Sequence, residues 1–201
     1  STRDWSTTDG TLEAKSQWEL VVDELIRDGD SRRALVAVYS AQDACRAARG
    51  TRDVPCTVSI QLLLRDGHLN AIATMRSCDA VWGLANDVFS FTMMQEMAAV
   101  ELSERGLDVK LGRYVHQAGS LHVYERHFGM LDEVSRECCP AAEMPPLERR
   151  RDLDKLLEDE VALRTGRQPS SARYGGAAAW LRSALEAHRA RRDAEPAQSS
   201  T

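Results

Sequence analysis

The sequence predicts an α+β protein, because strand-like and helical segments are mixed along the chain without the regular rhythm of βαβ units. Three features carry this prediction: an early amphipathic helix, a hairpin signal after it, and a long helix soon after the hairpin. The chain has 201 residues, 43 % hydrophobic and 28 % charged, which is typical of a folded chain rather than a disordered one. This length suits one ordinary domain with an appendage.

The first quarter of the chain predicts a helix and a strand. Apolar residues recur at helical spacing over residues 12–28, and Gly29 between two aspartates is expected to end that helix. The short β-branched run at 34–39 predicts a buried strand. The polar, Arg- and Ala-rich segment 40–53 predicts a loop or a short helix.

A β-hairpin is the clearest local signal. Strand-like runs at 57–65 and 69–75 flank an Asp-Gly-His turn, and an Asp-Gly pair favours a tight hairpin. Residues 86–105, rich in Met, Ala, Leu and Glu, form the strongest predicted helix, with Gly106 as its C-terminal cap. The segment 114–124 is strand-like again, and the residues after it turn helical.

The last part of the chain differs in character from the rest. A break with three prolines covers 138–146, and charged amphipathic helices are expected around 153–163 and over 177–192. We therefore expect a main domain at 1–146 and a helical C-terminal extension at 147–201.

Charge and spacing exclude several classes of protein. The net charge of −5 argues against nucleic-acid binding, since such domains are usually basic. No apolar run reaches the roughly 18 residues that a membrane span needs, and no signal-peptide pattern opens the chain. The five cysteines are odd in number and irregularly spaced, which argues against a disulfide framework and a zinc site. We expect a cytoplasmic protein without a metal, a nucleic-acid partner or a membrane partner.

Cys56 is the first candidate for chemistry. It follows a proline at the mouth of the predicted hairpin, which would bring Arg76 and Asp79 at the end of the second strand back beside it. An arginine close to a thiol favours the thiolate, which is the nucleophilic form. The alternatives are a buried structural cysteine, a surface arginine and an aspartate that caps a turn.

Five short motifs occur in order along the chain at consistent spacing. They are Pro55-Cys56, Asp66-Gly67, Arg76-Ser77-Cys78-Asp79, Gly83-Leu84 and His122-Val123-Tyr124. Together with Ser31-Arg32-Arg33, they make roughly residues 16–127 resemble the thymidylate synthase family. The resemblance implies a thymidylate-synthase-like α+β fold, with a large curved mixed sheet flanked by helices, through which two subunits pack back to back.

The resemblance implies roles for the matched residues. Cys56 is the nucleophile that adds to C6 of a pyrimidine nucleoside monophosphate. Arg76 and Ser77 bind the phosphate, while Arg32 and Arg33 reach across a homodimer interface to complete the phosphate site of the neighbouring subunit. Guanidinium groups suit this task because they bind a phosphate bidentately.

Three further matched residues are expected to hold the sugar and the co-substrate. His122 and Tyr124, two residues apart on one predicted strand, place their side chains on the same face, which by resemblance binds the sugar hydroxyl. Asp79 matches a residue that contacts folate. The resemblance thus implies 5,10-methylenetetrahydrofolate as the co-substrate that supplies a one-carbon unit to C5 of the nucleotide.

The position that reads the base departs from the family pattern. After Gly83-Leu84 the family has a proline, an aromatic residue and an asparagine that pairs with uracil. This sequence has Ala85, Asn86 and Asp87 there. A carboxyl group that shares a proton with N3 of cytosine also accepts from its N4 amino group, and the family's cytidylate hydroxymethylases show the same exchange. Two alternatives stay open: Asp87 caps the helix that begins there, or Asn86 pairs with the base after a one-residue slip.

Other departures concern the two ends of the family pattern. The family's N-terminal segment, with a phosphate-binding arginine and a glutamate that orders the catalytic water, is expected to be absent from this sequence. Ser120 stands where the synthases often have an aspartate. Residues 148–201 do not resemble the family's C-terminal tail, which closes over folate.

The resulting hypothesis is a cytidylate 5-hydroxymethyltransferase that acts on CMP or dCMP. The family scaffold supports two reactions, because hydride from the folate gives a methyl group whereas water gives a hydroxymethyl group. Such enzymes serve phage DNA modification and nucleoside-antibiotic biosynthesis, and the Arg- and Ala-rich composition favours the latter. The alternatives are a thymidylate synthase that acts on dUMP and a catalytically reduced nucleotide-binding protein.

Overall fold

A computed structural model describes residues 15–137 and 143–194, and the chain divides into two compact units, 1–139 and 140–201. The first unit contains a mixed sheet with the strand order β1-β2-β3-β5 in its described part. These strands are β1 (Leu35–Ala37), β2 (Thr57–Arg65), β3 (His68–Met75) and β5 (Lys110–Ala118). The first three are antiparallel and β5 joins β3 in parallel, which confirms the predicted mixed α+β architecture.

The predicted hairpin is confirmed and determines where the strand ends meet. Thr57 of β2 pairs with Met75 of β3, so the residues just outside this pair, Cys56 and Arg76, are neighbours. At the other end, Asp66 and Gly67 have φ values of 50° and 71°. Two consecutive positive φ angles are what the type I′ turn of a two-residue hairpin requires.

Two short strands that follow β3 and β5 in the chain form a separate two-stranded sheet. They are β4 (Cys78–Asp79) and β6 (Leu121–His122), which pair in parallel. The chain bends between β5 and β6 at Gly119, where a Cβ atom would lie 3.2 Å from the backbone oxygen of Arg76. A side chain at that position would require the Arg76 backbone to shift by a few tenths of an ångström.

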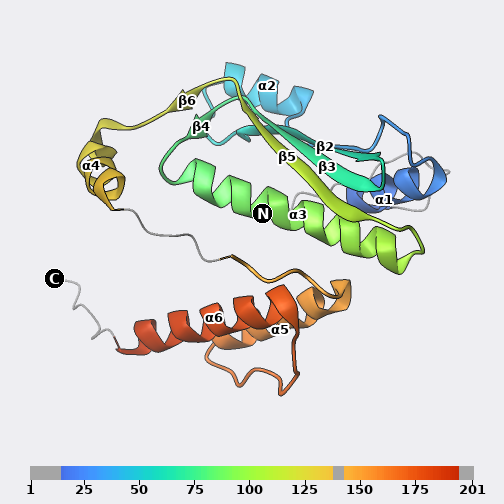
Figure 1. Cartoon of the computed structure of the whole chain (residues 1–201). Helices are drawn as coiled ribbons and strands as arrows, with labels where there is room; N and C mark the ends of the chain where they lie inside the picture. The colour runs from blue at the N-terminus through green and yellow to red at the C-terminus, as the bar shows by residue number, and fades with distance from the viewer. Residues whose placement is uncertain (1–14, 138–142, 195–201) are drawn as a thin grey trace. The chain divides into compact units, whose positions relative to one another are not determined.

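Helices cover one face of the sheet. In Figure 1, α3 (Gly83–Glu104) runs along β2, β3 and β5, and α1 (Gln17–Arg27) lies near one end of them. The core forms where Leu25 of α1, Leu69 of β3 and Leu102 of α3 pack together, each with no exposed surface. Burial of apolar side chains from three elements is the main term that holds this layer against the sheet.

Several helix boundaries refine the sequence-based predictions. α1 begins after Ser16, whose hydroxyl and the Glu19 carboxylate form a capping box; residues 12–14 of the predicted helix lie outside the described residues. The segment 40–53 contains the short helix α2 (Ala41–Ala48) rather than only a loop. The remaining elements of this unit are η1 (Glu125–His127) and α4 (Phe128–Arg136).

The second unit contains the two predicted C-terminal helices. They are α5 (Arg150–Arg164) and α6 (Gly176–Ala194), which pack against each other. The division between the units falls a few residues before the predicted boundary at 146, and the assignment of 147–201 as an extension stays a prediction. None of the described helices is both long and apolar enough to cross a membrane.

Candidate active site

Cys56 and Arg76 meet at the mouth of the hairpin, as the sequence predicts. The backbone N–H of Arg76 donates to the carbonyl of Cys56 at 2.9 Å, and its guanidinium donates to the carbonyls of Pro55 at 2.9 Å and Val54 at 3.3 Å. These bonds hold the loop that presents the exposed Cys56. A guanidinium has five N–H donors, so two such bonds leave capacity for an anion.

A second cysteine lies behind Cys56. Cys78 is 2 % exposed, and its Sγ lies 3.9 Å from Oδ2 of Asp87. Burial raises the pKa of the Cys78 thiol, and the charges of Asp87, Asp79 and Cys56 raise it further. Cys78 therefore stays protonated near neutral pH, and of these two cysteines only Cys56 is exposed to a ligand.

Asp87 lies in the second turn of α3, on the side that meets β4. Because α3 begins at Gly83, Asp87 does not cap the helix, which removes that alternative. A Cβ atom on Gly83 would contact Asp79, Cys78 and Asp87 at 3.4 to 3.8 Å, so these three side chains surround one glycine. Burial raises the pKa of Asp87, while the positive charge of His116 and the Cys78 thiol act in the opposite direction.

The expected sugar and folate residues lie on the next pair of strands, β4 and β6, or just after it. Asp79 of β4 pairs with His122 of β6, and Oδ1 of Asp79 accepts from the backbone N–H of Val81 at 3.0 Å. The rings of His122 and Tyr124 meet edge to face, with centroids 5.0 Å apart. Tyr124 lies just outside β6, which corrects the prediction that both residues share one strand, and the guanidinium of Arg126 covers its ring at 4.3 Å.

The structure does not bring the two arginines after α1 to this site within one chain. Arg33 binds Glu24 at 2.8 Å and Asp28 at 3.7 Å, and hydrogen bonds from Ser31, Arg33 and Arg27 lower the pKa of Glu24 to about 2. The guanidinium of Arg32, in contrast, has no partner among the described residues, and Arg32 is exposed. Arg32 could therefore serve a neighbour without breaking an ion pair, whereas Arg33 would have to leave Glu24 and Asp28, and the role of both arginines stays a prediction.

Ser77 is the remaining predicted phosphate ligand. It is half-buried between Arg76 and Cys78, and its hydroxyl makes no hydrogen bond within the part of the chain that the structure describes. Ser77 follows Arg76 in the sequence, and an anion bound by both residues would supply a partner for its hydroxyl.

Sequence reasoning missed three residues around Asp87. The hydroxyl of Tyr114 lies 2.7 Å from Nδ1 of His116, and the ring of Phe91 stacks on His116 at a centroid distance of 6.4 Å. Alternation along β5 could have placed Tyr114 and His116 on one face, and the i,i+4 spacing on α3 could have placed Asp87 and Phe91 together. Only the pairing of distant elements shows that these two faces meet.

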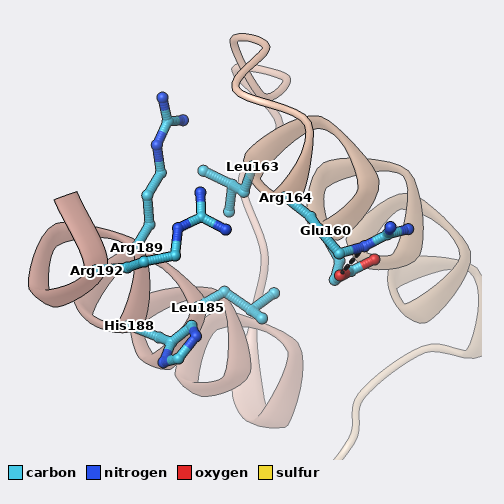
Figure 2. Close-up of a pocket in the computed structure, with 7 residues that line it drawn as sticks. All are labelled: Glu160, Leu163, Arg164, Leu185, His188, Arg189 and Arg192. Atoms are coloured by element: carbon cyan, nitrogen blue, oxygen red, sulfur yellow. Dashed lines mark hydrogen bonds and ion pairs between the residues drawn. The ribbon is translucent and has the colours of Figure 1, made fainter. Parts of the chain in front are cut away.

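Figure 2 shows a separate hollow of about 130 Å³ in the second unit. It is lined by apolar and charged side chains of α5 and α6, namely Glu160, Leu163, Arg164, Leu185, His188, Arg189 and Arg192. None of the sequence-predicted site residues lines it. Within residues 15–137 and 143–194, no group of His, Cys, Asp or Glu side chains is arranged to hold a metal ion.

Comparison with known proteins bears on both the family and the fold. The sequence model of the thymidylate synthase family matches residues 1–169, and the chain belongs to that family. It is 31 % identical over 121 residues to the deoxycytidylate 5-hydroxymethyltransferases of phages T4 and T6, a match that covers 58 % of this chain and 49 % of the T4 protein. The chain thus spans about half the length of these relatives.

A solved structure shows the same fold. Thermostable thymidylate synthase A from Bacillus subtilis superposes with a TM-score of 0.58, covering 70 % of this chain and 49 % of that protein at 24 % identity. The predicted thymidylate-synthase-like fold is therefore confirmed. The family match extends to residue 169 and so includes all of α5, beyond the predicted domain boundary.

Proposed function

We propose that this chain carries the nucleotide site of a pyrimidine C5 one-carbon transferase that hydroxymethylates cytidine monophosphate, as CMP or dCMP. The observation that carries the choice of cytosine is Asp87, whose burial raises its pKa beside Cys78 and behind Cys56. A carboxyl that keeps its proton can donate to N3 of cytosine and accept from the N4 amino group. The phage relatives with printed deoxycytidylate activity support the same choice.

Cys56 supplies the covalent step. Its sulfur forms a bond to C6 of the pyrimidine, and the electron pair of the C5–C6 double bond moves to C5, which becomes the nucleophile. The co-substrate 5,10-methylenetetrahydrofolate supplies the one-carbon unit. C5 bonds to that carbon, and loss of the C5 proton and of tetrahydrofolate leaves an exocyclic methylene group on C5. Water adds to this methylene to give the hydroxymethyl group, and the C6–sulfur bond breaks, which restores the ring double bond and the thiolate.

Other side chains bind and orient the ligands. Arg76 and Ser77, consecutive at the end of β3, would hold the phosphate, while His122 and Tyr124 would hold the sugar hydroxyl. Asp79 uses one carboxylate oxygen on Val81 and keeps the other for a donor on the folate ring. The exposed indole of Trp82, which follows Asp79 closely in the sequence, would offer a flat apolar surface to the folate ring.

We further propose a homodimer through the sheet face opposite α3. Leu35, Gln61, Ile72 and Val115 form one row across the four strands, because each pairs with the next. Leu35 and Val115, at the two ends of the row, are 41 % and 42 % exposed. Arg32 precedes the strand at one edge of this face, from which it would reach the phosphate site of the partner subunit.

The test is turnover with each nucleotide. The protein is incubated with 5,10-methylenetetrahydrofolate and CMP, dCMP or dUMP, and both the product mass and the formation of dihydrofolate are measured. We expect a hydroxymethylated cytidylate without dihydrofolate. Dihydrofolate with dUMP would instead identify a thymidylate synthase, and no product with any nucleotide would identify a binding protein.

A further inference from the structure

Tyr124 has an exposed ring that three neighbouring side chains contact. Tyr124 is 44 % exposed, and the guanidinium of Arg126 lies over its ring at 4.3 Å from the centroid. The rings of His122 and His127 meet it edge to face, with centroids 5.0 Å and 6.2 Å away and interplanar angles of 90° and 87°. An exposed side chain without such contacts exchanges among its staggered rotamers. The three neighbours therefore restrict a ring that its exposure would otherwise leave free to turn.

A short backbone turn brings two of these neighbours to Tyr124. The residues that follow it form η1, and the backbone N–H of His127 donates to the carbonyl of Tyr124 at 2.8 Å. A bond between residues i and i+3 is that of a 3₁₀ turn, in which the side chains of these two residues lie one above the other. His127 is thus placed next to the Tyr124 ring by the backbone, and Arg126 reaches the ring from the same turn.

Arg126 also binds His127 and so connects Tyr124 to a helix. Its Nε donates to Nε2 of His127 at 3.1 Å. Because a guanidinium can only donate, Nε2 accepts, and a neutral His127 carries its proton on Nδ1. The His127 ring meets the ring of Trp82 edge to face at 6.3 Å, and Trp82 is the N-cap residue of α3. The contacts of Arg126 therefore extend from Tyr124 to the start of the helix that carries Asp87.

The polar end of Tyr124 stays available to a ligand. Its hydroxyl makes no hydrogen bond within the described residues, and neither do the ring nitrogens of His122. A cation over the face of a tyrosine is attracted by its π electrons, and 4.3 Å is well within the roughly 6 Å over which this attraction acts. The ring is thus held through its face and edges while its hydroxyl remains unused by the protein.

We propose that Arg126 is a positioning residue that holds Tyr124 in the orientation in which its hydroxyl meets the sugar hydroxyl of the nucleotide. This inference rests on the proposed function, because it assumes that Tyr124 contacts the sugar. Ordering a free side chain on binding costs conformational entropy, so a ring that is fixed beforehand binds its ligand more tightly. Arg126 acts through the ring of Tyr124 rather than on the nucleotide.

The test measures affinity for nucleotides that differ only in the sugar. Binding of CMP, dCMP and 2′,3′-dideoxycytidine monophosphate, which has no free sugar hydroxyl, to the full chain is followed by calorimetry. We expect Arg126→Met, which keeps a long apolar stem but removes the guanidinium, to weaken binding of the preferred cytidylate by about two- to tenfold. Binding of the dideoxy nucleotide should not change, because it has no hydroxyl for Tyr124 to meet.

Two further variants show whether the effect passes through Tyr124. In a Tyr124→Phe background, which lacks the hydroxyl, Arg126→Met should cause no additional loss of affinity. Arg136→Met is the matched control, at an arginine of the same unit whose side chain is 73 % exposed and pairs with Asp132. It should leave the affinities for all three nucleotides in place.

The outcomes separate this inference from the proposed function. A wild type that binds no cytidylate would overturn both. A wild type that binds cytidylate, with an equal affinity in Tyr124→Phe, would overturn the sugar contact and this inference but not the role of Asp87. A folded Arg126→Met variant that keeps its affinity, or that loses it equally for the dideoxy nucleotide, would overturn only the role of Arg126. Thermal unfolding establishes whether the variant folds, and if it does not, Arg126→Gln provides the same comparison.

Discussion

Asp159 and Asp87 both lie on helices and are at least partly shielded from solvent, but their surroundings shift the pKa of the carboxyl group in opposite directions. Asp159 of α5 is 2 % exposed and accepts hydrogen bonds from Ser170, Tyr174 and Arg182. Burial alone would raise the pKa of Asp159, but these partners outweigh it and lower the pKa. Within the described part of the chain, the Asp87 carboxyl on α3 has only the Cys78 thiol, at 3.9 Å, as a hydrogen-bond partner, and burial raises its pKa.

This difference indicates that Asp159 has a structural role, whereas the carboxyl group of Asp87 is available to a ligand. Asp159 joins α5, the following loop and α6, and its oxygens are fully used within the protein. Asp87 keeps hydrogen-bonding capacity that the protein does not use, which is unfavourable for folding and useful for recognition. We expect substitutions at the first site to change stability and substitutions at the second to change base selectivity.

The largest effect is expected at Cys56. Cys56→Ser should abolish turnover, because an alcohol is rarely ionised near neutral pH, while nucleotide affinity largely survives. Cys45→Ser, at the other exposed cysteine among the described residues, is the matched control and should keep activity. Steady-state kinetics and calorimetry measure the two quantities. A Cys56→Ser enzyme with a tenth of wild-type activity would contradict covalent catalysis.

We expect removal of the Asp159 carboxylate to lower the free energy of unfolding more than removal of an exposed carboxylate on the same helix. Asp159→Ala leaves Arg182, whose side chain is 13 % exposed, without its buried partner, and such changes cost about 3–5 kcal/mol. Urea denaturation followed by circular dichroism measures the free energy of unfolding. Asp154→Ala on the same helix removes a 62 % exposed partner of Arg150, and should cost far less. Equal losses in the two variants would refute the structural role of Asp159.

The interface proposal predicts recovery of activity in mixed dimers. Inactive Cys56→Ser chains mixed with inactive Arg32→Ala chains should form heterodimers in which one of the two sites has both an intact thiol and an intact arginine. With random pairing, about a quarter of the wild-type activity should return. Heterodimers that form, as shown by mass spectrometry of tagged chains, but stay inactive would place Arg32 outside the partner's site.

The two aspartates should also respond oppositely to pH. The folded-state pKa of Asp159 is lowered, so its contribution to stability is present above the unfolded value of about 3.9 and is lost as the pH falls through the lower folded value. The pKa of Asp87 is raised, so its contribution is present below about 3.9 and is lost as the pH rises through the higher value. Unfolding curves measured from acidic to neutral pH should show this. Asp159→Asn should lack the loss of stability at low pH, and Asp87→Asn should lack the loss of stability as the pH rises.

Most elements of the fold could be predicted from local sequence patterns, because helices and hairpins depend on residues that are close in sequence. The hairpin follows from its Asp-Gly turn, and the middle of α3 follows from its composition. The start of α3 was predicted three residues late, since the N-cap residue Trp82 makes no side-chain capping bond that could mark it. The environment of Asp87 depends on contacts between α3, β4 and β5, and no local pattern reports such long-range pairing.

The central claim is that Asp87 reads the base, and the most direct measurement is the ratio of kcat/KM for cytidylate and uridylate in the wild type and in Asp87→Asn. The amide reverses the donor and acceptor pattern, and an unpaired buried edge costs about 1–3 kcal/mol. The account therefore predicts that the ratio shifts toward uridylate by roughly five- to hundred-fold. A ratio that is unchanged within error would contradict it and would favour a thymidylate synthase instead.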